Sequence, residues 1–495
     1  MITSTDRAEC GSLWEFSRPL ACTHPQRERR SAVGARRPFG RSTRFVLLAI
    51  ALACFVLWPS AARATAIPFP RAEDGDGIKV GERSTFHAGF ALATGVDTNV
   101  FYEAKEEDPQ AAAYLLPTAW LGIGNRVVRG GVLNMPPERS SRILDYNIYA
   151  VGGFRQYLSG QESVRRQSRF SIGGVIRLAF LPGRRFSILF DEDIFRLADP
   201  ANLDAGAEFN FNRIDHRGRL SFIGRPGGGR LSLLVGFRNE LLWFEGDELT
   251  LTRNNRMVNG LFHETKWRFF PKSALVFNYS FDHTYYISCC AETGRGRNED
   301  NYAHRIQGGY RGQFREKFTI SALAGWGYGY YRDDSDGPDF NSFIGDVSFT
   351  YYPTLRSYVT VSGYRAFADS LLGNYFVDNG ARLGGGHEFR WRMIARLGFG
   401  VAGRTYHGLP RPGSGDAAID SYEGRNAPAL QRKDTLVMVD AKLEQPLGRI
   451  WALALGYNLL IDAADFRTQF VQPMPFLDHA GFVKHWVMLF GAVRI

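Results

Sequence analysis

Apolar and polar residues alternate with a period of two along this chain, from about residue 84 to its end. The alternating runs are about 10–13 residues long, and residues 318–330 illustrate them. One face of that run carries Phe318, Ile320, Ala322, Ala324, Trp326, Tyr328 and Tyr330, and the other carries Thr319, Ser321, Gly325, Gly327 and Gly329. Because side chains of a β-strand point alternately to its two faces, the pattern predicts strands and no long amphipathic helix.

About eighteen candidate strands follow from this alternation. They lie at 84–95, 112–123, 142–156, 167–180, 185–196, 206–222, 231–244, 256–270, 273–286, 300–315, 318–331, 341–352, 355–367, 377–392, 394–406, 433–444, 449–460 and 482–494. Aromatic residues gather at the ends of the apolar faces, as they do at the two borders of a bilayer. We expect an all-β fold, an antiparallel up-and-down transmembrane β-barrel of about eighteen strands, with sixteen or twenty as alternatives.

The connections between the predicted strands alternate between short and long. Tight turns follow the even strands at Leu181–Arg184, Arg225–Arg230, Phe270–Ser273, Arg315–Lys317, Tyr352–Thr354 and Gln445–Gly448. Long polar loops follow the odd strands at Asn99–Gln110, Ser288–Glu299, Tyr331–Phe340, Gly408–Gln431 and Asp462–Gly481. Outer-membrane barrels have short periplasmic turns and long outer loops, so we expect both barrel termini in the periplasm. The long connection Gly124–Ser141 breaks the alternation and leaves room for an extra hairpin.

The first 66 residues resemble a secretory signal. An Arg-rich stretch precedes Phe45–Trp58, which carries no charge, and the small residues Ala64-Thr65-Ala66 follow. This apolar run is shorter than the roughly 20 residues that a membrane-spanning helix needs. We expect a signal peptide at 1–66, a short periplasmic segment at 67–83 and the barrel at 84–495. The alternatives are a retained anchor helix, lipidation at Cys54 and a start codon further downstream.

Charge and cysteine content narrow the function classes. The net charge is +10, and six of these charges belong to the first 66 residues, so the basicity does not indicate nucleic-acid binding. After signal cleavage only the adjacent Cys289 and Cys290 remain, which excludes a disulfide scaffold; they are idle thiols or a vicinal disulfide. The sequence has no metal-ligand spacing, phosphate loop or dinucleotide fingerprint, so we expect no cofactor and no metal.

The faces opposite the apolar ones should line the lumen, and they carry charges. The candidate residues along the solute path are Arg155, Arg169, Arg177, Arg305, Arg311, Arg382, Glu388, Arg390 and Arg404. Further charges on these faces are Asp145, Arg238, Glu240, Glu264, Lys266, Arg268, Asp346 and Arg396. Basic groups outnumber acidic ones, and such a wall would concentrate anions. The alternative is that these groups pair across strands; inward glycines such as Gly325, Gly327, Gly384 and Gly400 favour an open pore.

Both ends of the barrel sequence resemble a known class of protein. The opening Gly95–Phe101, its polar continuation to Gln110 and then Tyr114–Pro117 are similar to the first strand of outer-membrane β-barrel porins and of myxobacterial exopolysaccharide-pathway barrels. The segment Phe482–Leu489, with Lys484, His485 and Trp486, resembles their last strand, which closes the barrel on the first. The resemblance implies passage through the outer membrane, plausibly of polysaccharide.

These observations predict an outer-membrane conduit for polysaccharide or other polar and anionic solutes in a Gram-negative bacterium. Its expected partners are outer-membrane lipid, the barrel-insertion machinery, and polysaccharide with periplasmic export components. We do not expect an enzyme, because no spacing ties a serine and an acid to His263, His304, His387 or His485. The alternatives are a barrel enzyme acting on lipid, and a structural or adhesive barrel whose loops bind partners.

Overall fold

The computed structural model describes residues 77–125, 143–198, 212–245, 254–287, 300–331, 339–371, 373–409, 419–470 and 476–495. The predicted signal peptide, Cys289, Cys290 and most of the connection Gly124–Ser141 lie outside these residues.

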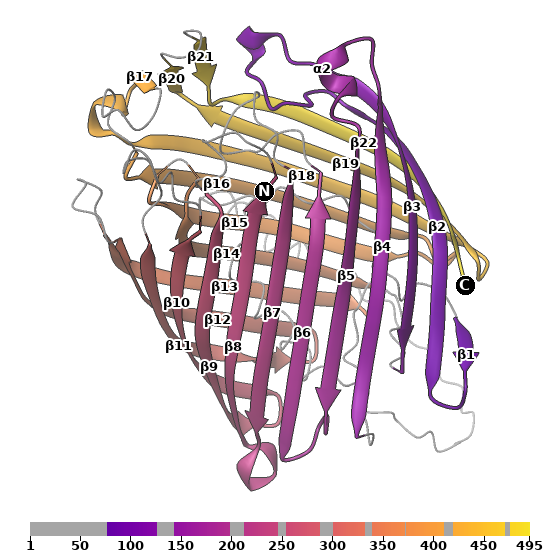
Figure 1. Cartoon of the computed structure of the whole chain (residues 1–495). Helices are drawn as coiled ribbons and strands as arrows, with labels where there is room; N and C mark the ends of the chain where they lie inside the picture. The colour runs from indigo at the N-terminus through magenta and orange to yellow at the C-terminus, as the bar shows by residue number, and fades with distance from the viewer. Residues whose placement is uncertain are drawn as a thin grey trace, which may run out of the picture.

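Eighteen long strands of the described residues form one sheet that closes on itself (Figure 1). They are β2 (Ser84–Asp97), β3 (Ala112–Gly124), β4 (Leu144–Leu158), β5 (Arg169–Phe180), β6 (Phe186–Leu197), β7 (Arg213–Gly224), β8 (Leu231–Phe244), β9 (Arg256–Phe270), β10 (Ser273–Tyr286), β11 (Asn301–Arg315), β12 (Phe318–Tyr331), β13 (Phe340–Thr354), β14 (Ser357–Asp369), β15 (Tyr375–Glu388), β16 (Ile394–His407), β18 (Arg432–Leu447), β19 (Trp451–Ala464) and β22 (Phe482–Arg494). Neighbouring strands pair antiparallel, and the predicted barrel class and strand number are confirmed.

The last strand closes the barrel on the first, as predicted. β22 pairs with β2 from Gly89↔Arg494 to Asp97↔Trp486. Beyond the ladder, the amide of Ile495 donates to the carbonyl of Ala88 at 2.9 Å. Both barrel termini therefore lie at the end that carries the short turns, which we call the turn end; the opposite end is the loop end.

Several strand boundaries differ from the prediction, and three of them show a clear cause. β13 and β18 run through their prolines to Thr354 and Leu447, since pairs such as Pro446↔Ala452 continue the ladder. β15 stops at Glu388 and not at residue 392, because the amide of Arg392 donates to the carbonyl of Phe389 and starts a turn.

Small elements surround the barrel. β1 (Ile78–Val80) pairs with the start of β2 at the turn end, within the predicted N-terminal segment. At the loop end, β17 (Ile419–Gly424), β20 (Phe466–Phe470) and β21 (Phe476–His479) form a separate three-stranded sheet, which the alternation did not predict. The other small elements are α2 (Glu162–Arg165), η3 (Lys105–Glu107), η4 (Pro226–Gly229) and η5 (Ala427–Ala429). No described helix is long and apolar enough to span a membrane.

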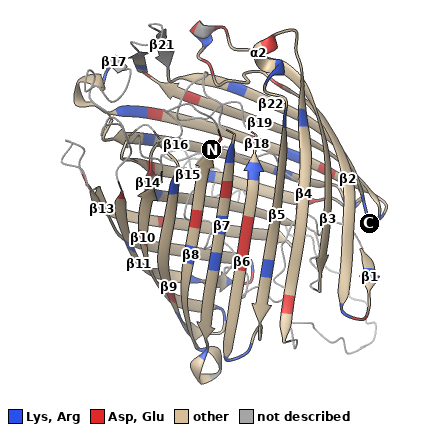
Figure 2. Ribbon diagram, in the orientation of Figure 1, with Lys and Arg blue, Asp and Glu red and all other residues tan. Residues whose placement is uncertain are grey.

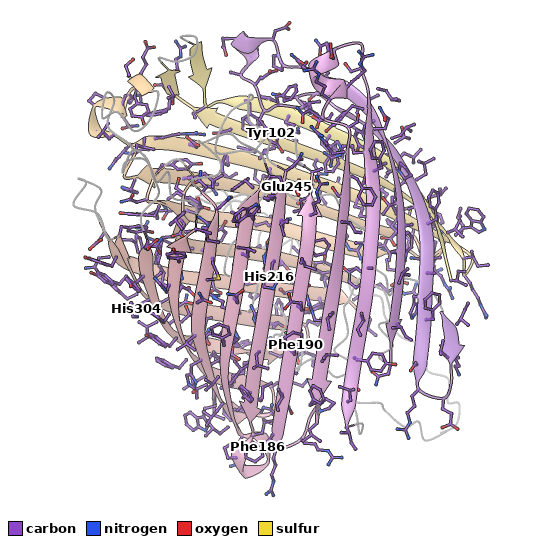
Figure 3. The ribbon with its side chains drawn as sticks, viewed as in Figure 1. Tyr102, Phe186, Phe190, His216, Glu245 and His304 are labelled. Atoms are coloured by element: carbon purple, nitrogen blue, oxygen red, sulfur yellow. The ribbon has the colours of Figure 1, made fainter. Side chains whose placement is uncertain are left out.

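The outer face of the barrel is apolar and carries an aromatic belt at each end (Figure 3). Leu453, Leu455 and Val487 are 46, 45 and 42% exposed, whereas Ala454 is 8% exposed on the inner face. Exposed aromatic residues at the turn end are Phe186, Trp267, Phe270, Phe314, Trp391 and Trp451, and at the loop end Trp243, Tyr285, Tyr328 and Tyr330. An apolar band between two aromatic belts is the surface that a lipid bilayer requires, so the barrel is of the outer-membrane type.

The loop-end part of the β14–β15 hairpin leaves the wall and lies inside the barrel. Pairing between β13 and β14 ends at Gly345↔Arg365, although both strands continue. Val359 and Val361 of β14 are exposed to lipid, but Phe367, on the same face, is buried against the inward residues Phe340 and Ile344. The hairpin tip therefore fills part of the lumen.

Candidate functional site: the charged lumen

Basic and acidic residues lie along the strands of the barrel wall (Figure 2). Arg238 of β8 and Arg305 of β11 point into the lumen, because their neighbours Phe237 and Ile306 are 43 and 46% exposed on the outer face. Asp282 of β10 pairs in register with Ala303, which lies two residues before Arg305 on the same face of β11. The carboxylate of Asp282 lies between the two arginines.

Asp282 is shared by two arginines from different strands. Arg238 donates through Nε to Oδ1 of Asp282 at 2.8 Å and through Nη2 to Oδ2, and Arg305 donates through Nη1 to Oδ2 at 2.8 Å. The three side chains are 6, 12 and 3% exposed for Arg238, Arg305 and Asp282. The guanidinium of Arg305 also lies 4.4 Å from the ring centre of Phe367. Two cations on one carboxylate leave this cluster with one net positive charge.

Glu264 of β9 is shared in the same way. Its Oε2 accepts from Nη1 of Arg311 at 2.8 Å, and its Oε1 lies 2.8 Å from Nζ of Lys266. Arg219 of β7 adds a further charge to this part of the wall; it stands opposite Arg238 and lies 5.3 Å from the ring of Phe262. Strands β7–β11 therefore form a wall section with an excess of positive charge.

The remaining wall is closer to balanced. The ion pairs of this remaining wall include Arg177 with Asp191 and Asp193, Arg382 with Asp440, Arg396 and Lys442 with Glu444, Arg404 with Asp378, and Arg432 with Asp434 and Asp462. Five predicted path residues, Arg177, Arg305, Arg311, Arg382 and Arg404, thus pair with carboxylates across strands. Of these, Arg382 stays the most accessible, with 54% of its side chain exposed.

The other predicted residues are placed differently. Arg155 faces the lumen beside Tyr114 and Tyr157, and its Nη1 donates to the Tyr157 hydroxyl at 3.2 Å. Arg169 begins β5 at the loop end and is exposed. Glu388 ends β15. Arg390 is not on an inward face: it lies exposed in the turn after β15, because the strand ends before it.

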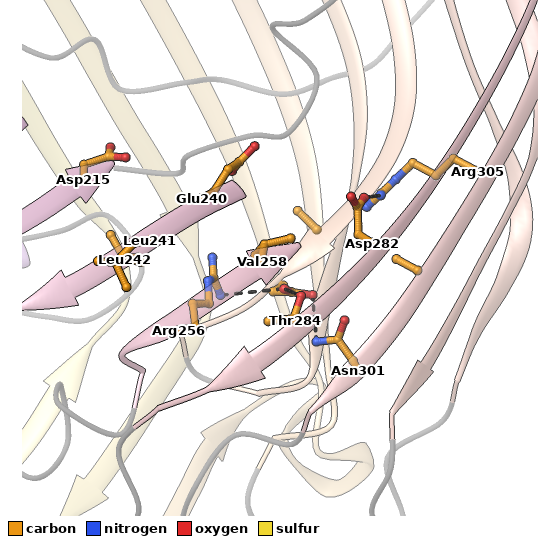
Figure 4. Close-up of a pocket in the computed structure, with 13 residues that line it drawn as sticks. Asp215, Glu240, Leu241, Leu242, Arg256, Val258, Asp282, Thr284, Asn301 and Arg305 are labelled. Atoms are coloured by element: carbon orange, nitrogen blue, oxygen red, sulfur yellow. Dashed lines mark hydrogen bonds and ion pairs between the residues drawn. The ribbon is translucent and has the colours of Figure 1, made fainter. Parts of the chain in front are cut away.

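A small pocket lies between the wall and the inward hairpin (Figure 4). Its lining includes Arg256, Thr284 and Asn301 from the wall and Asp369 from β14. Thr284 and Asn301 donate to the two carboxylate oxygens of Asp369 at 3.1 and 3.3 Å, and Arg256 lies 3.9 Å from it. Asp369 therefore fixes the hairpin tip to the inner wall.

An apolar cluster narrows the lumen at the loop end. Val100 and Phe101, in the loop between β2 and β3, are 0 and 6% exposed. They belong to one buried cluster with Phe244 of β8, Val164 of α2 and Leu371 at the hairpin tip. The polar composition of this loop predicts an outer loop and not its inward course, although the apolar pair in a polar stretch was a usable signal.

The predicted closing-strand residues hold this loop in place. Lys484 faces inward: its Nζ lies 2.8 Å from Asp97, donates to the carbonyl of Asn99 at 2.6 Å and sits 4.0 Å from the ring centre of Tyr102. Trp486 packs against the same apolar cluster. His485 faces outward, and its Nδ1 lies 3.0 Å from the hydroxyl of Tyr457.

The inward glycines do not all leave open space, contrary to the prediction. A Cβ atom on Gly327 would lie 2.6 Å from Phe367 and 2.8 Å from Phe340, so aromatic rings of the inward hairpin and β13 occupy that space. At Gly384 and Gly400 the nearest atom would be 3.8 Å away. Space beside the wall is therefore local to Gly384 and Gly400, because a Cβ atom on Gly398 would lie 2.3 Å from Asp440.

Comparison with known proteins yields structural similarity alone. No protein-family model matches the sequence, and no curated protein matches it. The outer membrane protein OpdK from Pseudomonas aeruginosa aligns over 83% of this chain and 99% of its own, with 10% identity and a TM-score of 0.41. OccAB4 from Acinetobacter baumannii aligns over 83 and 98%, with 10% identity and a TM-score of 0.40. The siderophore receptor PirA from Pseudomonas aeruginosa aligns over 82 and 80%, with 7% identity and a TM-score of 0.37. The closed barrel, its apolar outer face and its charged lumen make this chain an outer-membrane-type β-barrel.

Proposed function

We propose that this barrel is a non-enzymatic conduit for polar, anionic solutes. The observation that carries the proposal is the positive charge of the wall section β7–β11, where Asp282 and Glu264 each form ion pairs with two basic side chains. A lumen wall with an excess of one charge attracts ions of the opposite sign and excludes ions of its own.

The proposed anion class includes acidic polysaccharide. The resemblance of the two end strands to exopolysaccharide-pathway barrels supports a polymer. The cluster around Phe101 and Leu371 narrows the loop end, so a polymer would pass as a single extended strand and only after this cluster moved aside. Small anionic solutes need less space than a polymer, and we place them first.

The reversal potential in planar bilayers tests the anion preference. Lys266→Gln removes the second cation on Glu264 and leaves the Arg311 pair intact, so we expect the potential to shift toward cation preference at low salt. The shift should shrink in about 1 M salt, where the Debye length falls to about 3 Å. Arg390→Gln, in the exposed turn, is the matched control and should change nothing. Equal potentials for wild type and Lys266→Gln at low salt would refute anion selectivity by this wall.

A further inference from the structure

A row of polar side chains crosses the lipid-facing surface of strands β6–β10. The strand register aligns Glu192 with Gly218, Gly218 with Asn239, Asn239 with Asn259, and Asn259 with His283. We call Glu192, His216, Asn239 and Asn259 the outer polar patch. His216 lies next to the row on β7 (Figure 3).

The alternation of each strand places this patch on the outside. Ile194, on the same face of β6 as Glu192, is 49% exposed. Phe237 shares a face with Asn239 and is 43% exposed, and Leu261 shares a face with Asn259 and is 55% exposed. The charged groups of the lumen wall, such as Asp191 and Arg238, occupy the opposite faces of β6 and β8.

The patch is internally paired but retains hydrogen-bonding capacity. His216 Nε2 lies 2.5 Å from Glu192 Oε1, and these side chains remain 23 and 21% exposed. Asn239 Nδ2 donates to Asn259 Oδ1 at 2.8 Å. Within the part of the chain that the structure describes, this is the only side-chain bond of either amide, so one carbonyl and one amino group stay available on the outer surface.

The patch lies well inside the membrane. On β6, Phe186 belongs to the turn-end belt, and Arg196 marks the loop-end border through its ion pair with Glu245. Ten residues at about 3.3 Å each, tilted by about 40°, give a height of about 25 Å, the thickness of an outer-membrane apolar band. Glu192 is four residues below Arg196, and therefore about 10 Å inside the border.

Polar groups at such a depth are unfavourable in contact with lipid. Charged residues on the lipid face of a barrel destabilise it most near the midplane, and ionisable residues inside membranes almost always face protein. A polar row at this position therefore indicates a surface that protein covers.

We infer that the outer polar patch is the interface between two copies of this chain. Identical membrane proteins associate about an axis normal to the bilayer, and rotation about that axis keeps every group at its depth. In a two-fold dimer formed by this face, the patch of one copy meets the patch of the other at the same height. The amide oxygen of Asn239 is a hydrogen-bond acceptor and the amide nitrogen of Asn259 is a donor. Asn239 of one copy can therefore accept a hydrogen bond from Asn259 of the other copy across the interface. Gly218, which lies between Glu192 and Asn239 in the row, lets the two walls approach closely.

Native mass spectrometry of the full protein in lipid nanodiscs tests the stoichiometry. We expect the mass of two copies. A single-copy mass, a three-copy mass or a complex with a different protein would overturn the inference.

Disulfide cross-linking locates the interface. In a background of Cys289→Ser and Cys290→Ser, single cysteines at Ile194, Phe237 and Leu261 should yield a dimer band in outer membranes for at least one site. Single cysteines at Val347, Leu397 and Val487, which are exposed on other parts of the wall, are the matched controls and should remain monomeric. A dimer band from the controls alone would place the interface elsewhere and overturn the inference.

Apolar substitution separates an interface from a lipid-exposed patch. Asn239→Leu with Asn259→Leu should raise the dimer dissociation constant roughly 5- to 30-fold, because cross-interface hydrogen bonds are lost. The folded fraction should be unchanged or higher, since leucine is favoured wherever lipid covers this face. An unchanged dimer dissociation constant in a fully folded variant would contradict the role of the patch.

Discussion

Asp282→Asn isolates the contribution of the shared carboxylate in the lumen wall. The substitution keeps the shape of the side chain but removes the negative charge that pairs with Arg238 and Arg305. Both arginines would then lose the carboxylate that they share, and all three side chains are nearly buried, at 12% exposure or less.

The structure predicts a large loss of stability for this change. Removing one partner of a buried ion pair costs about 3–5 kcal/mol, because the remaining charge cannot be solvated. The matched control is Asp440→Asn: Arg382 and Asp440 are 54 and 37% exposed, and an exposed pair contributes only about 0–1 kcal/mol. We therefore expect the two variants to differ by at least about 2 kcal/mol in the free energy of unfolding.

Urea unfolding in lipid vesicles, followed by the heat-dependent gel shift of the folded barrel, measures this difference. Double substitution of Asp282→Asn with Arg305→Gln should recover part of the loss, since Arg238 would no longer face a second cation. Equal midpoints for Asp282→Asn and Asp440→Asn would refute the reasoning that burial, and not pairing as such, decides the contribution of these ion pairs.

Two further predictions concern the orientation of the barrel. Leu455→Arg places a charge on the lipid face and should destabilise the folded barrel by roughly 2–4 kcal/mol, whereas Gly456→Arg points into the lumen, where the nearest atom is 3.8 Å away, and should be tolerated. Similar gel-shift profiles for both would mean that the faces are assigned wrongly. Epitope tags inserted at Gly296 and Gly415 should be accessible on intact cells, and a tag at Gly227, in a turn, should not. Labelling at Gly227 alone would mean that the barrel has the opposite orientation in the membrane.

The strands could be predicted from the sequence because their signal is local. Alternation over ten or more residues requires no knowledge of neighbours, and the predicted 231–244, 256–270 and 273–286 coincide with β8, β9 and β10. Arg390 was misplaced because alternation continues past Glu388 in the sequence, while the turn is set by backbone hydrogen bonds that composition does not reveal.

The candidate site was only partly predictable. The alternation of apolar and polar residues within a strand decides which face each residue occupies. Arg305 and Arg311 could therefore be assigned to the lumen from the sequence. Their partners Asp282 and Glu264 follow from the register between strands, which a single sequence does not specify. The inward hairpin depends on contacts between Phe340 and Phe367, which belong to different strands, and it was therefore missed.

The seam between β2 and β22 sets the order in which the barrel can assemble. Across it the amide of His485 donates to Thr98, a residue 387 positions away, whereas a hairpin such as β9–β10 joins its strands through a short turn. Loop-closure entropy grows with the logarithm of chain length, so joining this seam costs roughly 4 kcal/mol more than closing a four-residue turn. Hairpins should consequently form early and the seam last, after the final strand has been delivered. Until then both edge strands are open to other chains, so the time between translocation and closure is the period in which this protein is most exposed to aggregation.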